Sequence, residues 1–355
     1  MLGILRYLLA VMVVLSHLWY DLMWWQGAYA VFCFYLISGY LMCLVINETY
    51  TGPGGIGRYA LNRILRIYPI YLLVLGLSIL VTIGFQSVLE QPLGNGLTFG
   101  KVMPLPESFG DWVANVTLLY LPSGNTFNVS PAWSLRVELF FYAAMLVLTR
   151  RVWLVVVWVG ASMLYALWLE HQGVFFIDRY TSVFGASIAF SLGASVYYLR
   201  QFVRIPDWNI PIATTAYFLH LWFAPDIWGF ARDYPTVRWF FESSTFGLYG
   251  NVMLGAYLLF AIVSSDRTRP VTHRIGAIAG NLAYPIFLLH WIAGTIILQT
   301  GVSFDEKSVY IPVALLTVNA MAFLAYRWVE LPINRGLRAR IRGNRGQMAV
   351  ARGTK

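Results

Sequence analysis

Ten long apolar segments constrain the fold of this chain more than any other feature of its sequence. They are residues 4–20, 27–47, 67–89, 132–149, 152–170, 180–199, 209–228, 247–265, 276–298 and 309–329. Each is close to the ~20 residues that an α-helix needs to cross a bilayer. Because backbone N–H and C=O groups in lipid must find partners within the chain, such segments fold as transmembrane helices. The sequence therefore predicts an all-α polytopic membrane protein with about ten transmembrane helices.

The composition agrees with a membrane protein and argues against a nucleic-acid partner. Only 12% of the 355 residues are charged and 59% are hydrophobic, whereas about 25% of a soluble protein is charged. The net charge of +9 comes from basic residues in short connections and near the C-terminus. Such residues are typical of topology signals and of contacts with membrane lipids. Cys33 and Cys43 are expected to be small buried residues, and no metal site is predicted.

The distribution of basic residues predicts the orientation. With a cytoplasmic N-terminus, the inner connections and the tail hold seventeen Lys and Arg residues, and the outer connections hold five. This bias favours ten spans with both termini in the cytoplasm. We expect a membrane domain at residues 1–334 and a basic cytoplasmic tail at 335–355. The first segment is expected to be retained, although Ala28-Tyr29-Ala30 resembles a signal-peptide cleavage site.

Two outer connections, at about residues 90–131 and 223–246, are long enough to be candidate lids. The first is rich in turn-forming residues and ends in Pro131, a favourable first residue for a helix. Connections of this length are usually functional or disordered. We therefore expect them to cover a cavity that faces outwards.

The first apolar segment contains two ionisable residues, Arg6 and His17. Eleven residues correspond to three helical turns plus about 20°, so both side chains lie on one face, roughly 16 Å apart along the axis. Ionisable groups within the membrane usually face a protein interior or a wet cavity. We therefore predict that this face holds a long ligand lying across the membrane. Asp21, four residues after His17, is positioned to orient its ring for general-base catalysis.

Three arginines precede the third apolar segment. Arg58, Arg63 and Arg66 are followed by Tyr68-Pro69. They are explained either by anchoring at the cytoplasmic face or by binding of a phosphorylated ligand, since guanidinium groups match phosphate oxygens. Both interpretations place them in a short cytoplasmic connection.

Polar residues also interrupt the second and fourth segments. Ser38-Gly39 provides small side chains that suit either close helix packing or the passage of a thin ligand. Ser134 and Glu138 are four residues apart and share a helix face. A glutamate two turns into a membrane helix is a candidate functional residue, whereas Trp133 also suits the interfacial belt.

The last two segments complete the pattern. Tyr284-Pro285 precedes His290, which lies near the middle of the ninth segment. Pro285 is expected to kink the helix and free a carbonyl group. Arg327 and Glu330 suit a structural cap at the cytoplasmic end of the final helix.

These segments, in this order, resemble the membrane-bound acyltransferase family 3, which contains bacterial O-acyltransferases of glycans, lipids and small molecules. The resemblance rests on the Arg6-to-His17 spacing, Phe34 to Tyr40, Arg63-x-x-Arg66 with Tyr68-Pro69, Trp133-Ser134-Leu135 with Glu138 and Phe141-Tyr142, Tyr284-Pro285 with His290, and Glu330-x-Pro332. The sequence departs from the family pattern at Arg136, where a small or polar residue is common, and at Leu139, where an acid is common.

The resemblance implies an acyl-coenzyme A donor, most often acetyl-CoA, and an acceptor hydroxyl on a glycan or glycolipid at the outer face of the bacterial cytoplasmic (inner) membrane. The implied coenzyme-binding residues are Arg6, Ser38, Gly39, Arg58, Arg63, Arg66 and Tyr68, and the implied acceptor-binding residues are Trp133, Ser134, Tyr142 and His290. His17 would be the general base or a transient acyl carrier, oriented by Glu138 or Asp21. We expect a standalone member that works with separate glycan-assembly proteins.

Two alternatives remain open from the sequence. Arg, His and Glu within membrane helices also suit a proton-coupled transporter or exporter, although no inverted repeat is visible. A succinyl or longer acyl donor is the second alternative.

Overall fold

The structure is a computed structural model that describes residues 1–85, 92–94, 97–119, 127–174, 176–232, 245–265 and 270–341. Within these ranges the regular secondary structure is helical apart from a short antiparallel pair, β1 (Pro92–Gly94) and β2 (Leu97–Thr98). The predicted all-α class is therefore confirmed.

A helix occupies each of the ten predicted segments. These helices are α1 (Leu2–Leu18), α2 (Tyr20–Glu48), α3 (Gly55–Gly84), α7 (Ala132–Leu148), α8 (Val152–His171), α10 (Ser187–Phe202), α11 (Asn209–Arg232), α13 (Thr245–Ser264), α14 (Pro270–Gln299) and α15 (Lys307–Ala325). Shorter elements are α5 (Phe99–Val102), α6 (Phe109–Thr117), α9 (Phe176–Thr181) and the 3-10 helix η1 (Phe184–Ala186). After α15 the chain continues as the π-helix η2 (Tyr326–Glu330), α16 (Leu331–Ile333) and the π-helix η3 (Asn334–Arg338).

Six helices within the described ranges are long and apolar enough to cross a membrane. They are Gln26–Glu48, Gly55–Gly84, Val152–His171, Gly247–Ser264, Arg274–Gln299 and Lys307–Ile341. α1 is apolar but shorter, at Leu2–Leu18. A multi-pass membrane protein follows, whereas ten spans and two cytoplasmic termini remain predictions.

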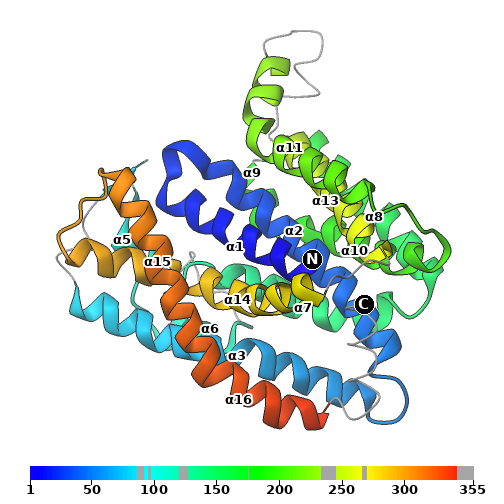
Figure 1. Ribbon diagram of the computed structural model, residues 1–355, viewed down its shortest axis with the longest axis horizontal. Coiled ribbons are helices and arrows are strands. Elements are labelled where there is room, and N and C mark those ends of the chain that lie inside the picture. Colours follow the sequence, from blue (N-terminus) through cyan, green and yellow to red (C-terminus); the bar gives the residue numbers. More distant parts are fainter. Residues whose placement is uncertain are drawn as a thin grey trace.

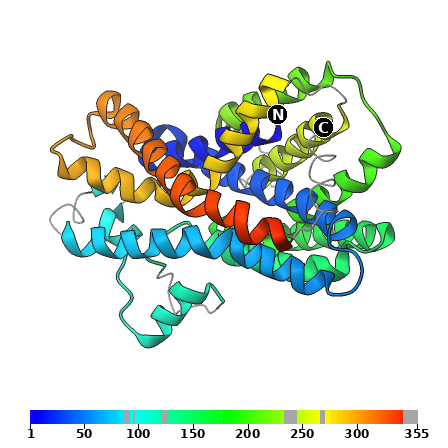
Figure 2. The ribbon, with the colours of Figure 1, turned by 60° about the horizontal axis from the view of Figure 1, so that its bottom comes forward.

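α1 and α2 lie at the centre of the molecule (Figure 1). α1 packs against α2 and α14, and α2 also packs against α10, α13 and α7. α14 in turn packs against α15 and α3, and α3 crosses the view of Figure 2 from its cyan end at the left to its blue end at the right. The N-terminal helix is therefore enclosed by segments from the whole length of the chain.

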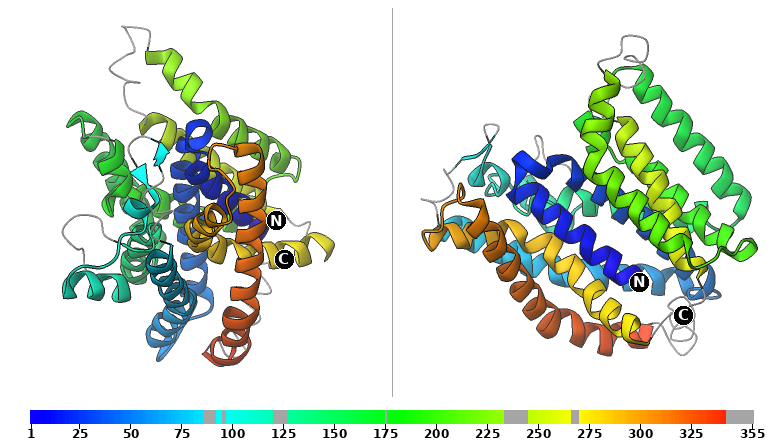
Figure 3. Two further views of the ribbon diagram at one scale, coloured as in Figure 1. Left: turned by 90° about the vertical axis from the view of Figure 1, so that its left-hand side faces the viewer. Right: turned by 45° about the horizontal axis from the view of Figure 1, so that its top comes forward.

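α1 and α14 lie side by side because glycines remove the side chains between them (Figure 3). A Cβ atom on Gly3 would lie 1.9 Å from the carbonyl oxygen of Gly276, and one on Gly280 would lie 2.9 Å from Gly3 Cα. Gly276 and Gly280 are four residues apart, the spacing that lets membrane helices approach closely. This contact aligns residue 3 with residue 276, and the same offset of 273 pairs His17 with His290.

α2 and α10 also approach closely through glycines. A Cβ on Gly39 would lie 2.3 Å from the carbonyl oxygen of Phe190, and one on Gly193 would lie 2.0 Å from that of Leu36. Gly39 therefore serves close helix packing, which is one of the two roles that the sequence suggested for Ser38-Gly39.

The start of α3 corrects one prediction. The helix begins at Gly55 rather than at residue 67, so Arg58, Arg63 and Arg66 lie on its first turns and not in a connection. Hydropathy marks where a helix leaves the hydrocarbon, whereas good helix formers such as Arg, Leu and Ala extend it further. Because these arginines are on a helix, only the side that faces the bundle can reach a ligand.

The C-terminal end of the last helix also lies further along than the sequence suggested. Residues 335–341, assigned to the tail, continue the helix through η3 to Ile341. Residues 342–355 lie outside the described residues. Arg338 is consequently a buried residue of the helix, with 7% of its surface exposed.

The described parts of the first candidate lid lie against the side of α3. The hydroxyls of Tyr68 and Tyr71 donate to the carbonyl oxygens of Thr117 and Asn115, and Ser78 Oγ lies 3.3 Å from the carbonyl oxygen of Asn128. Tyr68 and Ser78 are roughly 15 Å apart along the helix axis, so the segment extends down the helix rather than only over its end. In the second candidate lid, residues 233–244 lie outside the described residues.

Candidate active site

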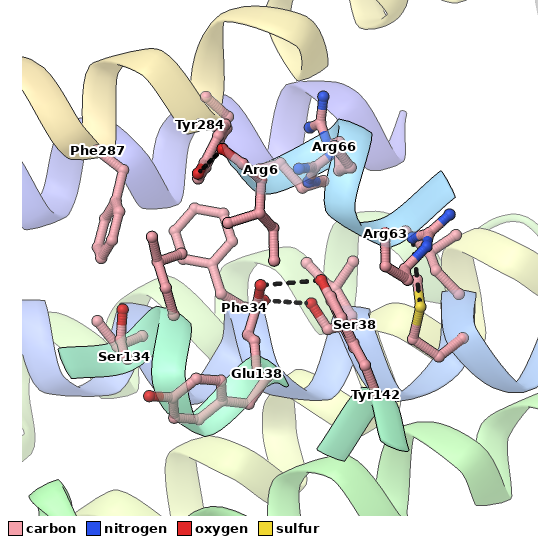
Figure 4. Close-up of a pocket in the computed structure, with 18 residues that line it drawn as sticks. Arg6, Phe34, Ser38, Arg63, Arg66, Ser134, Glu138, Tyr142, Tyr284 and Phe287 are labelled. Atoms are coloured by element: carbon pink, nitrogen blue, oxygen red, sulfur yellow. Dashed lines mark hydrogen bonds between the residues drawn. The ribbon is translucent and has the colours of Figure 1, made fainter. Parts of the chain in front are cut away.

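A cavity lies where five helices meet, and many of the predicted site residues line it (Figure 4). It offers about 110 Å³ to the centres of water-sized molecules. Its predicted lining residues are Arg6 on α1, Ser38 on α2, Arg63 and Arg66 on α3, and Ser134, Glu138 and Tyr142 on α7. Tyr284 and Phe287 of α14 also line it.

Three guanidinium groups give the cavity a positive side. Arg66 forms an ion pair with Glu330 and lies 5.5 Å from the centre of the Tyr284 ring. Arg63 donates to Asn62 Oδ1 at 3.0 Å, while its buried Nε has no hydrogen-bond partner. Arg6 forms no hydrogen bond or ion pair with any residue that the structure describes. The cluster therefore holds donors suited to an anionic ligand.

Glu138 is held by two hydroxyl groups. Ser38 Oγ donates to Glu138 Oε1 at 2.7 Å, and the Tyr142 hydroxyl donates to Oε2 at 2.9 Å (Figure 4). Its negative charge acts on Arg6 across the cavity. The two hydroxyl groups fix the position of the carboxyl group. In the structure Glu138 therefore belongs to the cavity wall, and no contact links it to His17.

His17 is instead paired with His290. His17 Nδ1 and His290 Nε2 are 2.8 Å apart, and the two rings are stacked with centroids 4.8 Å apart. His290 is fully buried, and its Nδ1 lies 2.8 Å from the carbonyl oxygen of Phe287.

These two contacts assign the tautomers of both neutral rings. A carbonyl oxygen only accepts, so His290 Nδ1 carries a hydrogen and its Nε2 is an acceptor. His17 must then donate through Nδ1, which leaves the lone pair of His17 Nε2 available. A histidine whose second nitrogen is fixed by a hydrogen bond is arranged as a general base.

An aromatic pair links the cavity to the two histidines. Phe34 and Phe287 line the cavity and their ring centroids are 6.1 Å apart. Phe287 lies three residues before His290 and provides the carbonyl that fixes it. On the far side, the Trp291 ring lies 5.1 Å from His17. The cavity and the histidine pair are therefore adjacent parts of one site.

Besides His17 and His290, four predicted site residues of the described ranges lie away from the cavity lining. Gly39 packs on α10, Tyr68 bonds Thr117, and Arg58 is exposed and lies 3.5 Å from the carbonyl oxygen of Thr51. Trp133 packs on Tyr180 with ring centroids 4.8 Å apart. The side chain of Asp21 lies outside the described residues.

The sequence interpretation missed a polar network below the cavity. Arg338 donates to Asn334 and to Asn62 Oδ1, the latter at 3.2 Å, and Asn62 Oδ1 also accepts from Arg63. Glu330, Asn334 and Arg338 follow one another at intervals of four residues, which places them on one helix face. That spacing is the signal that would have revealed the network.

One comparison with known proteins identifies the family of the chain. A family model described as an acyltransferase domain matches residues 2–327 of the 355-residue chain. No curated protein and no solved structure matches the chain. The matched region includes the cavity wall from Arg6 to Phe287 and both histidines, and it favours acyl transfer over the transporter alternative. The chain therefore belongs to acyltransferase family 3 and is a multi-pass membrane acyltransferase.

Proposed function

We propose that the protein transfers an acyl group, most simply acetyl, from cytoplasmic acyl-coenzyme A to a hydroxyl of a cell-surface or lipid-linked saccharide. We place it in the cytoplasmic membrane of a bacterium, where the acceptor meets the enzyme near the outer face. The observation that carries the proposal is the free lone pair of His17 Nε2, fixed through His290 beside a cavity rich in arginine.

The residues of the cavity fit a phosphorylated donor. Arg6 and the partnerless Nε of Arg63 are donors that an anion would satisfy. Arg66 already pairs with Glu330, so it adds positive charge without offering all of its donors. Bound coenzyme A supplies an acyl group activated as a thioester. Ser38 and the aromatic pair Phe34–Phe287 would line the path of its thin arm towards His17.

His17 then acts as the general base. Its Nε2 takes the proton of the acceptor hydroxyl while the hydroxyl oxygen forms an ester bond with the acyl carbon, and it returns that proton to the departing thiolate as the C–S bond breaks. His290 holds the ring in the required tautomer and accepts from Nδ1 as positive charge develops. His290 is therefore a positioning residue in this proposal rather than an acceptor contact.

The test uses His17→Ala with His171→Ala as its control, because His171 is an exposed histidine at the end of α8. Each variant is expressed in a strain that lacks the gene, and O-acetyl groups on surface glycans are measured by mass spectrometry. Thermal unfolding of the purified proteins with acetyl-CoA measures donor binding. We expect His17→Ala to lose glycan acetylation but still to be stabilised by acetyl-CoA. We expect His171→Ala to behave as wild type in both measurements.

Other outcomes would point elsewhere. Acetylation by His17→Ala would refute the catalytic role. Wild-type protein that saturating acetyl-CoA does not stabilise would refute that donor. Stabilisation by succinyl-CoA alone would then identify the longer donor, whereas no response to either would favour transport.

A further inference from the structure

Arg136 is a half-buried cation near the start of α7 that the mechanism above does not use. It lies on α7, two residues before Glu138, and the helical repeat of about 100° per residue directs the two side chains to different faces. Its Nε and Nη1 atoms are buried and have no hydrogen-bond partner. No described carboxylate forms an ion pair with it. A guanidinium group without partners inside a membrane protein is costly and is usually kept for function.

A second buried hydrogen-bond donor lies near Arg136. Tyr35 of α2 is 1% exposed, lines the cavity, and has a buried hydroxyl without a hydrogen-bond partner. Ring contacts bring Tyr35 close to this part of α7, because Phe32 lies 5.6 Å from the Tyr35 ring and 5.9 Å from the Tyr180 ring, which packs on Trp133. The charge of Arg136 also acts on the Tyr35 hydroxyl. Ser134, the nearby polar residue on α7, donates to the carbonyl oxygen of Pro131 at 2.8 Å. Two neighbouring helices thus present two buried donors to the same place. Arg136 has no described acceptor for Nε and Nη1, and the Tyr35 hydroxyl has only Ser134 within reach.

Half-buried aromatic rings flank this pair of donors. Trp133, three residues before Arg136, meets Tyr180 edge-on with centroids 4.8 Å apart. Tyr180 also acts electrostatically on Tyr35 and packs on Phe32, with centroids 5.9 Å apart. Aromatic faces pack against the apolar faces of sugar rings, while a guanidinium group matches the two oxygens of a carboxylate.

We propose that Arg136 and Tyr35 form an anion subsite beside the cavity, and that the acyl acceptor is a saccharide with an acidic group. The carboxylate or phosphate of the acceptor accepts from the Arg136 guanidinium and the Tyr35 hydroxyl, and its ring packs near Trp133 and Tyr180. This rests on the proposed function, because it names the class of its acceptor.

The test compares two sugars that differ only in charge. Methyl β-D-glucuronide carries a carboxylate where methyl β-D-glucoside carries a hydroxymethyl group. Thermal unfolding is measured in nanodiscs of phosphatidylcholine for wild type, Arg136→Gln, Tyr35→Phe and Arg150→Gln. Arg150 is the matched control, because it is an exposed arginine just beyond α7.

We expect the glucuronide, and not the glucoside, to raise the Tm of wild type and of Arg150→Gln. In Arg136→Gln the affinity for the glucuronide falls by about tenfold or more, the loss of a hydrogen bond to a charged group. Tyr35→Phe weakens binding to a smaller extent. Without ligand, Arg136→Gln is as stable as wild type or more stable, because it removes a cation that has no partner.

The proposal is overturned if the two sugars act alike, if neither acts, or if Arg136→Gln still prefers the glucuronide. The same proteins are also measured in nanodiscs that contain anionic phosphatidylglycerol. The proposal is overturned if this lipid, and not the sugar, gives the stabilisation that depends on Arg136, because Arg136 then binds a lipid headgroup. Stabilisation of the same proteins by acetyl-CoA is recorded in parallel. Its absence in wild type refutes the acetyl donor, whatever the sugars show.

Discussion

Replacement of His290 tests the site most directly, because His290 touches His17 and does not line the cavity. His290→Leu removes the acceptor of His17 Nδ1–H, while His290→Gln offers an amide oxygen in nearly the same place as Nε2. Loss of the acceptor leaves a donor unsatisfied at the buried end of the site. That loss costs about 1–3 kcal/mol, which corresponds to a roughly 5- to 160-fold smaller population of the productive tautomer, at 1.36 kcal/mol for each factor of ten.

The assay separates catalysis from donor binding. Membranes of the deletion strain provide the native acceptor, and thiol release from acetyl-CoA gives kcat and KM. We expect His290→Leu to lower kcat by about 5- to 160-fold with an unchanged KM for acetyl-CoA, since the arginines are not altered. His290→Gln should lose less than about fivefold, the lower limit of the same range. Thermal unfolding and stabilisation by acetyl-CoA confirm that each variant is folded.

Two results would refute this reasoning. Equal losses of kcat in His290→Leu and His290→Gln would show that the hydrogen bond to Nε2 does not matter. A raised KM with unchanged kcat would instead place His290 in the donor site, and the positioning role would be lost.

Three further predictions concern stability and are read from thermal or denaturant unfolding. Gly3→Leu should sharply lower Tm and abolish acyl transfer, because the new Cβ would lie 1.9 Å from the backbone of α14. Gly57→Ala is the control and should keep or raise Tm, because nothing lies within 4 Å of its new Cβ. Glu138→Leu leaves two hydroxyl donors unsatisfied, at a cost of about 1–3 kcal/mol each, and Glu138→Gln should cost less. Glu330→Gln removes the charge of the buried carboxylate that pairs with half-buried Arg66 and should cost up to about 3–5 kcal/mol. Arg66→Met in the same chain should restore part of this loss, and additive losses would contradict the pairing.

The sequence predicted the location of the helices well because hydropathy and helix length are local properties. All ten segments contain a helix, and Arg6, Ser38, Arg63 and Glu138 meet in one cavity as their polar character within the membrane suggested. The helix ends were less predictable. Apolar windows stop where charges begin, although a helix continues beyond the hydrocarbon, as α3 does before residue 67.

The partners of the predicted residues were the main unknown. The contact between His290 and His17 was not predicted, because the alignment of α1 with α14 depends on glycines that have no distinctive local pattern at Gly3. Arg338 was assigned to a tail because it stands among many arginines, yet it bonds Asn62 of α3. Such pairings depend on long-range packing, which no local pattern of residues specifies.

The offset of 273 residues between α1 and α14 has a consequence for biosynthesis. A membrane chain is made from its N-terminus, so α1 is synthesised long before α14, from which it is separated by more than two hundred residues. During that interval the growing chain has its arginines but lacks the residue that orients His17. In the proposed mechanism an unfinished chain is therefore inert towards cytoplasmic acyl-CoA. In that mechanism, the packing of α14 against α1 is the step that completes the histidine pair.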